Sequence, residues 1–211
     1  MSAQAADPHK LGHGDDVPIS ERGPAPQKIV VAYGFWIFLL SDFILFSGFF
    51  AAYAVLTPAT AGGPAGRDIF DLPLVAVETA ALLLSSFACG LAGVAATAGS
   101  RAWFQAAMAV TALLGATFLA IELYEFTHLI AAGHGPQRSA FLSAFFALVG
   151  CHGLHVMLGL VWLTTMMAQV QAKGFRDDIR RRIACFMLFW HALDIIWVAL
   201  FTMVYLLGAN A

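Results

Sequence analysis

Residues 34–56 read GFWIFLLSDFILFSGFFAAYAVL, an apolar run that a single acid, Asp42, interrupts. A helix needs about 20 mostly apolar residues to cross the hydrocarbon core of a bilayer. Backbone groups in lipid must find their hydrogen-bond partners inside the protein, so a helix is the expected spanning form. The run therefore predicts a transmembrane helix, which we place at residues 32–56.

Further along the chain, stretches of similar length and composition lie at residues 74–98, 102–130, 139–170 and 183–207. The connections between them carry prolines, glycines or, at Lys173–Arg182, a run of basic residues. The helices at 102–130 and 139–170 exceed the thickness of the hydrocarbon core, so they should tilt or project beyond it. The prediction is an all-α integral membrane protein, a bundle of five transmembrane helices over residues 32–211.

The composition supports a membrane protein and argues against a soluble one. Of 211 residues, 60% are hydrophobic and 11% are charged, whereas soluble domains carry about 25% charged residues. The net charge of -2 argues against a nucleic-acid partner. Charges gather in the first 28 residues and in short loops, so we expect residues 1–31 to form a polar, flexible cytoplasmic tail. This tail lacks the apolar segment of a cleavable signal peptide, so the first helix is expected to direct insertion.

Lysine and arginine are distributed unevenly between the two ends of the predicted helices. If the N-terminus is cytoplasmic, that side holds Lys10, Arg22, Lys28, Arg101, Lys173, Arg176, Arg180, Arg181 and Arg182. The other side holds Arg67 and Arg138. Because cytoplasmic loops carry the excess of basic residues, the N-terminus is predicted to be cytoplasmic. After five crossings, the C-terminus then lies on the opposite side.

Ionisable residues inside the predicted helices are the candidates for function, because an acid at the bilayer centre costs at least about 2.5–3.5 kcal/mol. Their depth, at about 1.5 Å per helical residue, divides them into two layers. The inner layer consists of Asp42, His152, His155, His191 and Asp194. The outer layer, where headgroups and water are expected nearby, consists of Glu78, Glu122, Glu125 and His128. We predict that the inner residues form one polar cluster where the helices at 32–56, 139–170 and 183–207 meet.

The spacing of the glutamates and histidines allows metal sites to be considered. Glu125 and His128 form one Glu-x-x-His motif with Glu122 a turn earlier, but a di-iron bundle needs two such motifs and two further glutamates. His152 and His155 share a helix face, where they could bind a metal or heme, or could bond to backbone carbonyls and acids. Bonding within the helix bundle is the favoured interpretation, and no catalytic, cofactor-binding or metal-binding residue is predicted.

The remaining inner residues favour structural pairing over chemistry. His191 and Asp194 have the i, i+3 spacing of an internal pair on one helix. A proton relay is the alternative, since buried acids and histidines mark such paths, but the inner residues do not form a continuous series across the bilayer. The cysteines Cys89, Cys151 and Cys185 show no paired spacing and are expected to be small buried apolar residues.

Several longer segments carry a resemblance to a known family. They are AGGPAGRDIFDLP at 61–73, VETAALLLSS at 77–86, IELYEFTHLI at 121–130, GPQRSAFLSAFFALVGCHGLHVMLGLVW at 135–162 and LFWHALDIIWVALFTMVYLLG at 188–208. Together with residues 34–56, they resemble subunit III of the heme-copper terminal oxidases, from about residue 30 to the end of the chain. The five-helix length and the loop at 61–73 resemble the cytochrome o ubiquinol oxidase branch. Cytochrome c oxidases normally have seven helices in this subunit.

The resemblance implies a non-catalytic subunit of a proton-pumping quinol oxidase in an aerobic respiratory chain. Such a subunit stabilises the heme-copper subunit I and supports sustained turnover. Heme and copper are then expected in subunit I and not in this chain, to which phospholipid can bind. The implied partners are subunit I, subunits II and IV, and the lipids of a bacterial inner membrane, with the C-terminus in the periplasm.

Some residues match the family's motifs directly, and two other functions stay open. Asp42 stands where the family carries an acid, and residues 152–155 and 190–194 match its His-Gly-Leu-His and Trp-His-x-x-Asp runs. The first alternative is subunit III of a cytochrome c oxidase with a shortened chain. The second, from another class, is a small membrane transporter that uses the inner polar cluster.

Overall fold

The computed structural model describes residues 27–208, and its regular structure there consists of helices alone. Five of them run the length of the molecule: α1 (Gln27–Leu56), α3 (Leu72–Thr97), α4 (Arg101–Ala131), α5 (Ala140–Lys173) and α6 (Asp177–Leu200). Helix α6 continues as a π-helical segment, η3 (Phe201–Leu206), and short turns α2 (Gly66–Ile69) and η2 (Pro136–Arg138) lie in the connections. All five long helices have the length and apolar composition needed to cross a membrane. The predicted five-helix membrane fold is confirmed.

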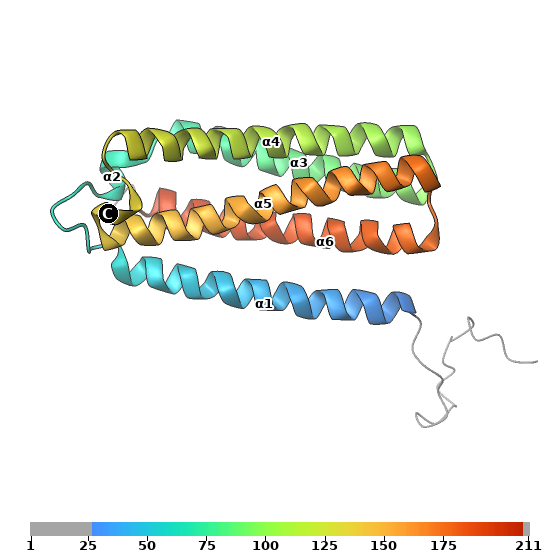
Figure 1. Cartoon of the computed structure of the whole chain (residues 1–211), viewed down its shortest axis with the longest axis horizontal. Helices are drawn as coiled ribbons and strands as arrows, with labels where there is room; N and C mark the ends of the chain where they lie inside the picture. Colours follow the sequence, from blue (N-terminus) through green and yellow to red (C-terminus); the bar gives the residue numbers. More distant parts are fainter. Residues whose placement is uncertain (1–26, 209–211) are drawn as a thin grey trace, which may run out of the picture.

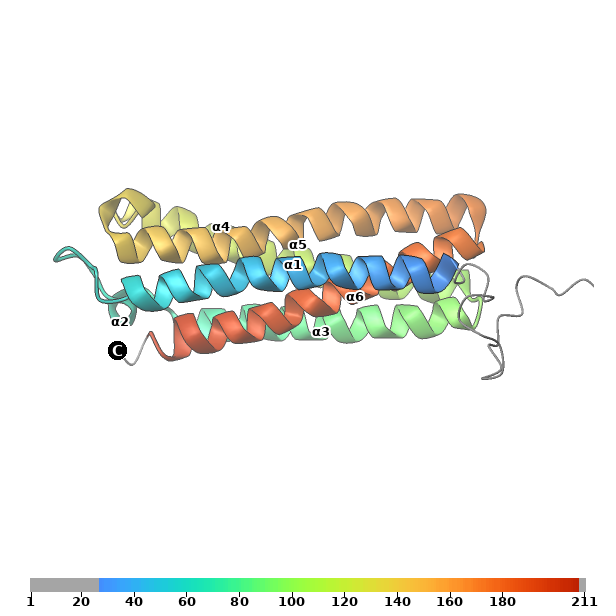
Figure 2. The same cartoon turned by 90° about the horizontal axis from the view of Figure 1, so that it is seen from below.

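The long helices lie roughly parallel to one another and alternate in direction along the chain (Figures 1 and 2). Helices α3, α4, α5 and α6 pack together, whereas α1 packs mainly on α5 and α6 from one side. In the most apolar 18-residue stretch of α1, 11% is buried inside the protein. The corresponding share is 61% for the last helix, α6 together with η3. Helix α6 therefore forms the centre of the bundle, and α1 keeps most of its surface available to lipid or to another protein.

Trp190 of α6 occupies the middle of the four-helix unit and is 1% exposed. Two glycines make room for its ring, Gly115 on α4 and Gly159 on α5. A Cβ atom at Gly115 would lie 2.9 Å from the ring, and one at Gly159 would lie 2.8 Å from it. These helices approach closely because glycine has no side chain, as is common where helices associate in lipid.

Most basic residues of the described chain gather at one end of the bundle, whereas Arg67 and Arg138 lie at the other. The start of α1, the α3–α4 turn and the α5–α6 turn all lie there, and α2 and η2 lie at the other end (Figure 1). Arg180 connects α6 to α3 at this end, because its Nη1 donates to the Ala96 carbonyl oxygen at the end of α3, 2.9 Å away. The structure thus groups the basic loops on one side, as the charge count requires.

Three boundaries differ from the sequence-based ones by three residues or more when η3 is counted with α6. The predicted basic loop Lys173–Arg182 is mostly helical, because α5 runs to Lys173 and α6 already begins at Asp177. Gly174, with φ of +71°, turns the chain between them. Asp177 and Asp178 occupy the first turn of α6, where acids interact favourably with the helix dipole. At the other terminus, residues 27–31 belong to α1, and the rest of the predicted tail lies outside the described residues.

Candidate functional site

Three glutamates and a tyrosine gather towards one end of the bundle, and we call them the acidic cluster: Glu78 on α3, Glu122 and Glu125 on α4, and Tyr205 in η3. None is more than 6% exposed. The Tyr205 hydroxyl donates a hydrogen bond to Oε2 of Glu125 at 3.1 Å. Glu78 and Glu122 both lie close enough to Glu125 to interact with it electrostatically. The acidic cluster therefore joins α3, α4 and the end of the last helix.

The glutamates of the acidic cluster are enclosed by protein. Both carboxyl oxygens of Glu78, Oε2 of Glu122 and Oε1 of Glu125 are buried without a hydrogen-bond partner among the described residues. A Cβ atom at Gly153 of α5 would collide with the Glu122 carboxyl group, so α5 closes the cluster on that side. Within the described chain the helices enclose these acids, because burial depends on helix rotation as well as on depth. That headgroups and water lie near this layer stays a prediction.

His128 was assigned to the same outer layer but faces the opposite way. Its side chain is exposed. Its ring stacks on Tyr124, which is also exposed, with a centroid distance of 6.0 Å and an interplanar angle of 19°. His128 therefore lies on the outer face of α4, and the Glu-x-x-His motif does not point into one site.

Asp42 and His155 lie where α1 meets α5. Asp42 is half-buried and interacts electrostatically with His155. His155 Nδ1 lies 2.7 Å from the carbonyl oxygen of Cys151, one turn earlier on α5. The ring of Phe46 from α1 lies 5.2 Å from the His155 ring. This contact is one polar attachment point for α1, and the Tyr53 hydroxyl, which donates to the Val204 carbonyl oxygen of η3 at 3.4 Å, is another.

His152 is completely buried, and neither of its ring nitrogens has a hydrogen-bond partner among the described residues. Aromatic rings surround it instead. Phe118 of α4 meets it edge to face at 5.7 Å, and Trp197 of α6 lies at 5.2 Å. His152 thus packs as an aromatic side chain at the junction of α4, α5 and α6.

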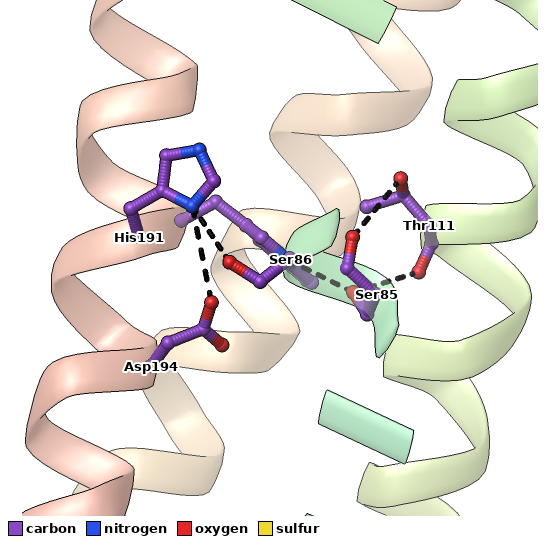
Figure 3. Close-up of polar contacts among 6 residues, drawn as sticks. Ser85, Ser86, Thr111, His191 and Asp194 are labelled. Carbon is purple, nitrogen blue, oxygen red and sulfur yellow. Dashed lines mark hydrogen bonds and ion pairs between the residues drawn. The ribbon is translucent and has the colours of Figure 1, made fainter. Parts of the chain in front are cut away.

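Ser86 of α3, together with His191 and Asp194 of α6, lines a groove that we call the polar groove (Figure 3). Ser86 Oγ lies 2.6 Å from His191 Nδ1, and Oδ2 of Asp194 lies 3.9 Å from the same nitrogen. The side chain of His191 is 42% exposed, whereas that of Asp194 is 8% exposed. The His191–Asp194 pair expected from the sequence is therefore present, with a third member from α3.

The inner residues make their contacts with different helices. Asp42 and His155 connect α1 with α5, whereas His191 and Asp194 face Ser86 on α3. The His191–Asp194 pair therefore lies at the α3–α6 contact, where His191 is hydrogen-bonded to Ser86. That all five inner residues form one cluster stays a prediction.

Several polar contacts between helices were missed because their residues carry no charge. Trp190 Nε1 donates to Ser85 Oγ at 2.9 Å, and Trp197 Nε1 donates to Thr79 Oγ1 at 3.0 Å. Ser85 is also bonded to the backbone of α4, as Figure 3 shows for its contact with Thr111. Each indole N–H in lipid needs an acceptor, and that requirement was the available signal. Residues 77–86 therefore hold α3 against α6 through small hydroxyl side chains.

No group of three or more His, Cys, Asp or Glu side chains in residues 27–208 is arranged to hold a metal ion. The positions of the histidines and glutamates in the motifs considered above account for this. His152 and His155 lie in different surroundings, and His128 points away from Glu122 and Glu125. In the described part of the chain, His152 and His155 lie at contacts between helices, and His128 lies on the outer face of α4.

The chain is similar to known oxidase subunits along most of its length. A model of the family cytochrome c oxidase subunit III matches residues 24–209. The chain is 49% identical over 209 residues to the cytochrome bo(3) ubiquinol oxidase subunit 3 of Pseudomonas aeruginosa, covering 99% of this chain and 97% of that one. It is 55% identical over 175 residues to the protein of that name from Pseudomonas putida, covering 83% and 84%. It is 41% identical over 175 residues to quinol oxidase subunit 3 of Bacillus subtilis, covering 83% and 86%.

Proposed function

The chain belongs to the cytochrome c oxidase subunit III family, and from this membership we propose that it serves as subunit III of a quinol oxidase. The observation that carries the proposal is the end-to-end match to a ubiquinol oxidase subunit, at 49% identity over 99% of this chain. Relatives from Pseudomonas putida and Bacillus subtilis are also named as quinol oxidase subunits. The family and the five apolar helices make it a multi-pass membrane subunit of a heme-copper oxidase.

We propose that the role of this subunit is to stabilise the complex and that oxygen is reduced elsewhere in it. The polar residues inside its helices support this role, because they connect helices to one another. Tyr205 bonds to Glu125, and Trp197 bonds to Thr79. Heme and copper are assigned to subunit I, and a bound phospholipid is compatible with the exposed apolar surface.

The expected partners are subunit I, as the main contact, and subunits II and IV. Helix α1 supports the expectation of a protein partner. Its exposed apolar side chains, Ile37, Leu40 and Ile44, are 54%, 53% and 72% exposed. In an isolated chain this apolar surface would face lipid without an energetic penalty. In a complex, some helix faces must instead contact the neighbouring subunits.

For the orientation, we propose that the N-terminus is cytoplasmic and the C-terminus periplasmic in the inner membrane. The support is the basic end of the bundle, which carries the α3–α4 and α5–α6 turns with Arg101 and Arg180. A single cysteine introduced at Ala209, in a chain without its native cysteines, should react with a membrane-impermeant maleimide added to the periplasmic side. Labelling that occurs only after the cytoplasmic side is made accessible would show that the topology is the opposite of the one proposed.

Purification of the complex through an affinity tag on this chain tests the function. The preparation should contain heme and should consume oxygen with ubiquinol as electron donor, but not with reduced cytochrome c. Oxygen consumption with cytochrome c alone would instead support the cytochrome c oxidase alternative. A preparation of this chain that carries no heme and no other oxidase subunit would contradict the proposal.

A further inference from the structure

We propose that the polar groove of Ser86, His191 and Asp194 is the docking site for a transmembrane helix of another oxidase subunit. That helix presents a hydroxyl or carboxamide side chain to His191. The inference rests on the proposed function, since it assumes that the chain is part of an oxidase complex. It goes further by naming the surface and the chemistry of the contact.

The first observation is a hydrogen-bonding deficit on the floor of the polar groove. His191 Nδ1 is engaged by Ser86 at 2.6 Å, but Nε2 of the same ring has no partner in the described chain. Figure 3 shows Nδ1 directed at Ser86 and Asp194, with the second ring nitrogen on the other side of the ring. Asp194 is 6% exposed, its carboxyl oxygens are enclosed by the described chain, and its Oδ2 lies 3.9 Å from His191 Nδ1. The groove thus presents an imidazole nitrogen without a partner among the described residues, held beside a buried carboxyl group.

The second observation is the depth of the polar groove in the membrane. His191 lies 14 residues after Asp177 and 15 before Leu206, which places it about 21 Å from either end of its helix. Ser86 lies similarly near the middle of α3. A hydrocarbon core is about 30 Å thick, so the groove opens at mid-membrane depth. Phospholipid headgroups do not reach that depth, and acyl chains cannot form hydrogen bonds with His191 or Asp194.

The third observation is the shape of the surface around the groove. The groove has a volume of about 370 Å³ and walls of Leu83, Ile195 and Val198. One turn from Ser86 lies Gly90, where a Cβ atom would meet nothing within 4 Å. The packing of this chain therefore does not require glycine there. Ser86 and Gly90 form a small-xxx-small pattern, which lets a second helix approach closely in lipid.

These observations together favour a helix that carries a group able to donate and accept. A hydroxyl or carboxamide can bond to His191 Nε2 as donor or as acceptor, whichever tautomer the ring adopts. Apolar residues beside that group would pack on Leu83 and Ile195, and its backbone would fit against Ser86 and Gly90. A bound phospholipid would fill the groove but would leave His191 Nε2 unpaired, which is unfavourable in a medium without water.

Site-specific photo-crosslinking in the intact complex tests the docking site. A photoreactive phenylalanine derivative replaces Ile195, at the rim of the polar groove, or Leu113, on the exposed face of α4; these residues are 63% and 68% exposed. With heme-containing complex purified through a tag on this chain, Ile195 should crosslink to another oxidase subunit in higher yield than Leu113. Crosslinks from Ile195 only to lipid, in a complex that contains heme, would overturn the docking site and leave the proposed function standing. Absence of heme would count against both.

A pair of variants tests the hydrogen bond itself. His191→Leu removes both ring nitrogens, whereas His191→Gln keeps a side chain able to donate and accept. His191→Leu should raise the dissociation constant of this chain from the detergent-solubilised complex about threefold, as expected for the loss of one interhelical hydrogen bond in a membrane. His191→Gln should weaken the retention of this chain less than His191→Leu does. Gly90→Leu should reduce the yield of the Ile195 crosslink, because its side chain blocks the close approach of the second helix. Equal retention of all His191 variants, with an unchanged crosslink in Gly90→Leu, would overturn the inference.

Discussion

Replacing Tyr205 with phenylalanine removes one hydroxyl group and keeps the aromatic ring in place. The ring is completely buried and packs against Phe70 at a centroid distance of 4.9 Å. The hydroxyl is the donor to Glu125 Oε2, and the other oxygen of Glu125 is already without a partner. The Tyr205→Phe variant therefore leaves a buried carboxyl group with no hydrogen bond from the described chain.

The expected loss of stability follows from that change. Removing one partner of a buried hydrogen bond costs about 1–3 kcal/mol, and hydrogen bonds between membrane helices lie at the lower end of such values. We expect a loss of about 1 kcal/mol, which multiplies the ratio of unfolded to folded chain about fivefold. Tyr124→Phe is the matched control, because Tyr124 is 61% exposed and its ring stacks on the equally exposed His128.

The reactivity of a buried thiol reports this stability within the complex. Cys89 on α3 is completely buried. With Cys151 and Cys185 replaced by alanine, a maleimide reacts with Cys89 only when the chain opens. Labelling of the purified complex is followed over a titration with sodium dodecyl sulfate, in the parent and in both tyrosine variants. Tyr205→Phe should be labelled at lower detergent, and Tyr124→Phe should match the parent.

A second substitution separates the hydrogen bond from other effects of the hydroxyl group. In a Glu125→Met background the acceptor is gone, so Tyr205→Phe should then change the labelling midpoint much less than it does in the parent chain. If Tyr205→Phe behaves like Tyr124→Phe, or if its effect is undiminished beside Glu125→Met, the assigned role of this contact is wrong.

Two further substitutions test other parts of the structure. Gly159→Ala places a Cβ atom 2.8 Å from the Trp190 ring, so it should destabilise the chain by about 1–3 kcal/mol in the same labelling assay. Gly150→Ala, on the same helix, meets its nearest atom at 3.4 Å and should cost less, and equal effects would contradict the packing account. Asp42→Ala should weaken retention of this chain or shorten sustained turnover, while the initial rate of oxygen reduction persists. Loss of that initial rate in a complex with full heme content would give Asp42 a role in the reaction itself.

The five helices were predictable because a membrane imposes one requirement on the whole chain. A spanning segment must be long and apolar, and that property is readable in sequence without knowledge of packing. The start of α6 at Asp177 was not predictable in this way, since the helix extends beyond the apolar segment into charged residues. Apolar length predicts where a helix crosses the core but not where it begins.

The candidate site was predictable by residue and depth, but not by orientation. Glu122, Glu125 and His128 are close in sequence, yet the two acids face the interior and the histidine faces outwards. Helices that are apolar on all sides give no periodic pattern from which rotation can be inferred. Tyr205 was missed for a related reason, since a tyrosine near a helix end is equally typical of a membrane interface.

The role of the chain as a supporting subunit is tested most directly by the oxidase prepared without it. Oxygen consumption with ubiquinol is recorded for complexes with and without this chain, matched for heme content and followed until activity declines. The account predicts equal initial rates and an earlier loss of activity in the complex that lacks the chain. A depleted complex that has lost its heme spectrum or its initial rate, or that stays active as long as the complete one, would contradict the account.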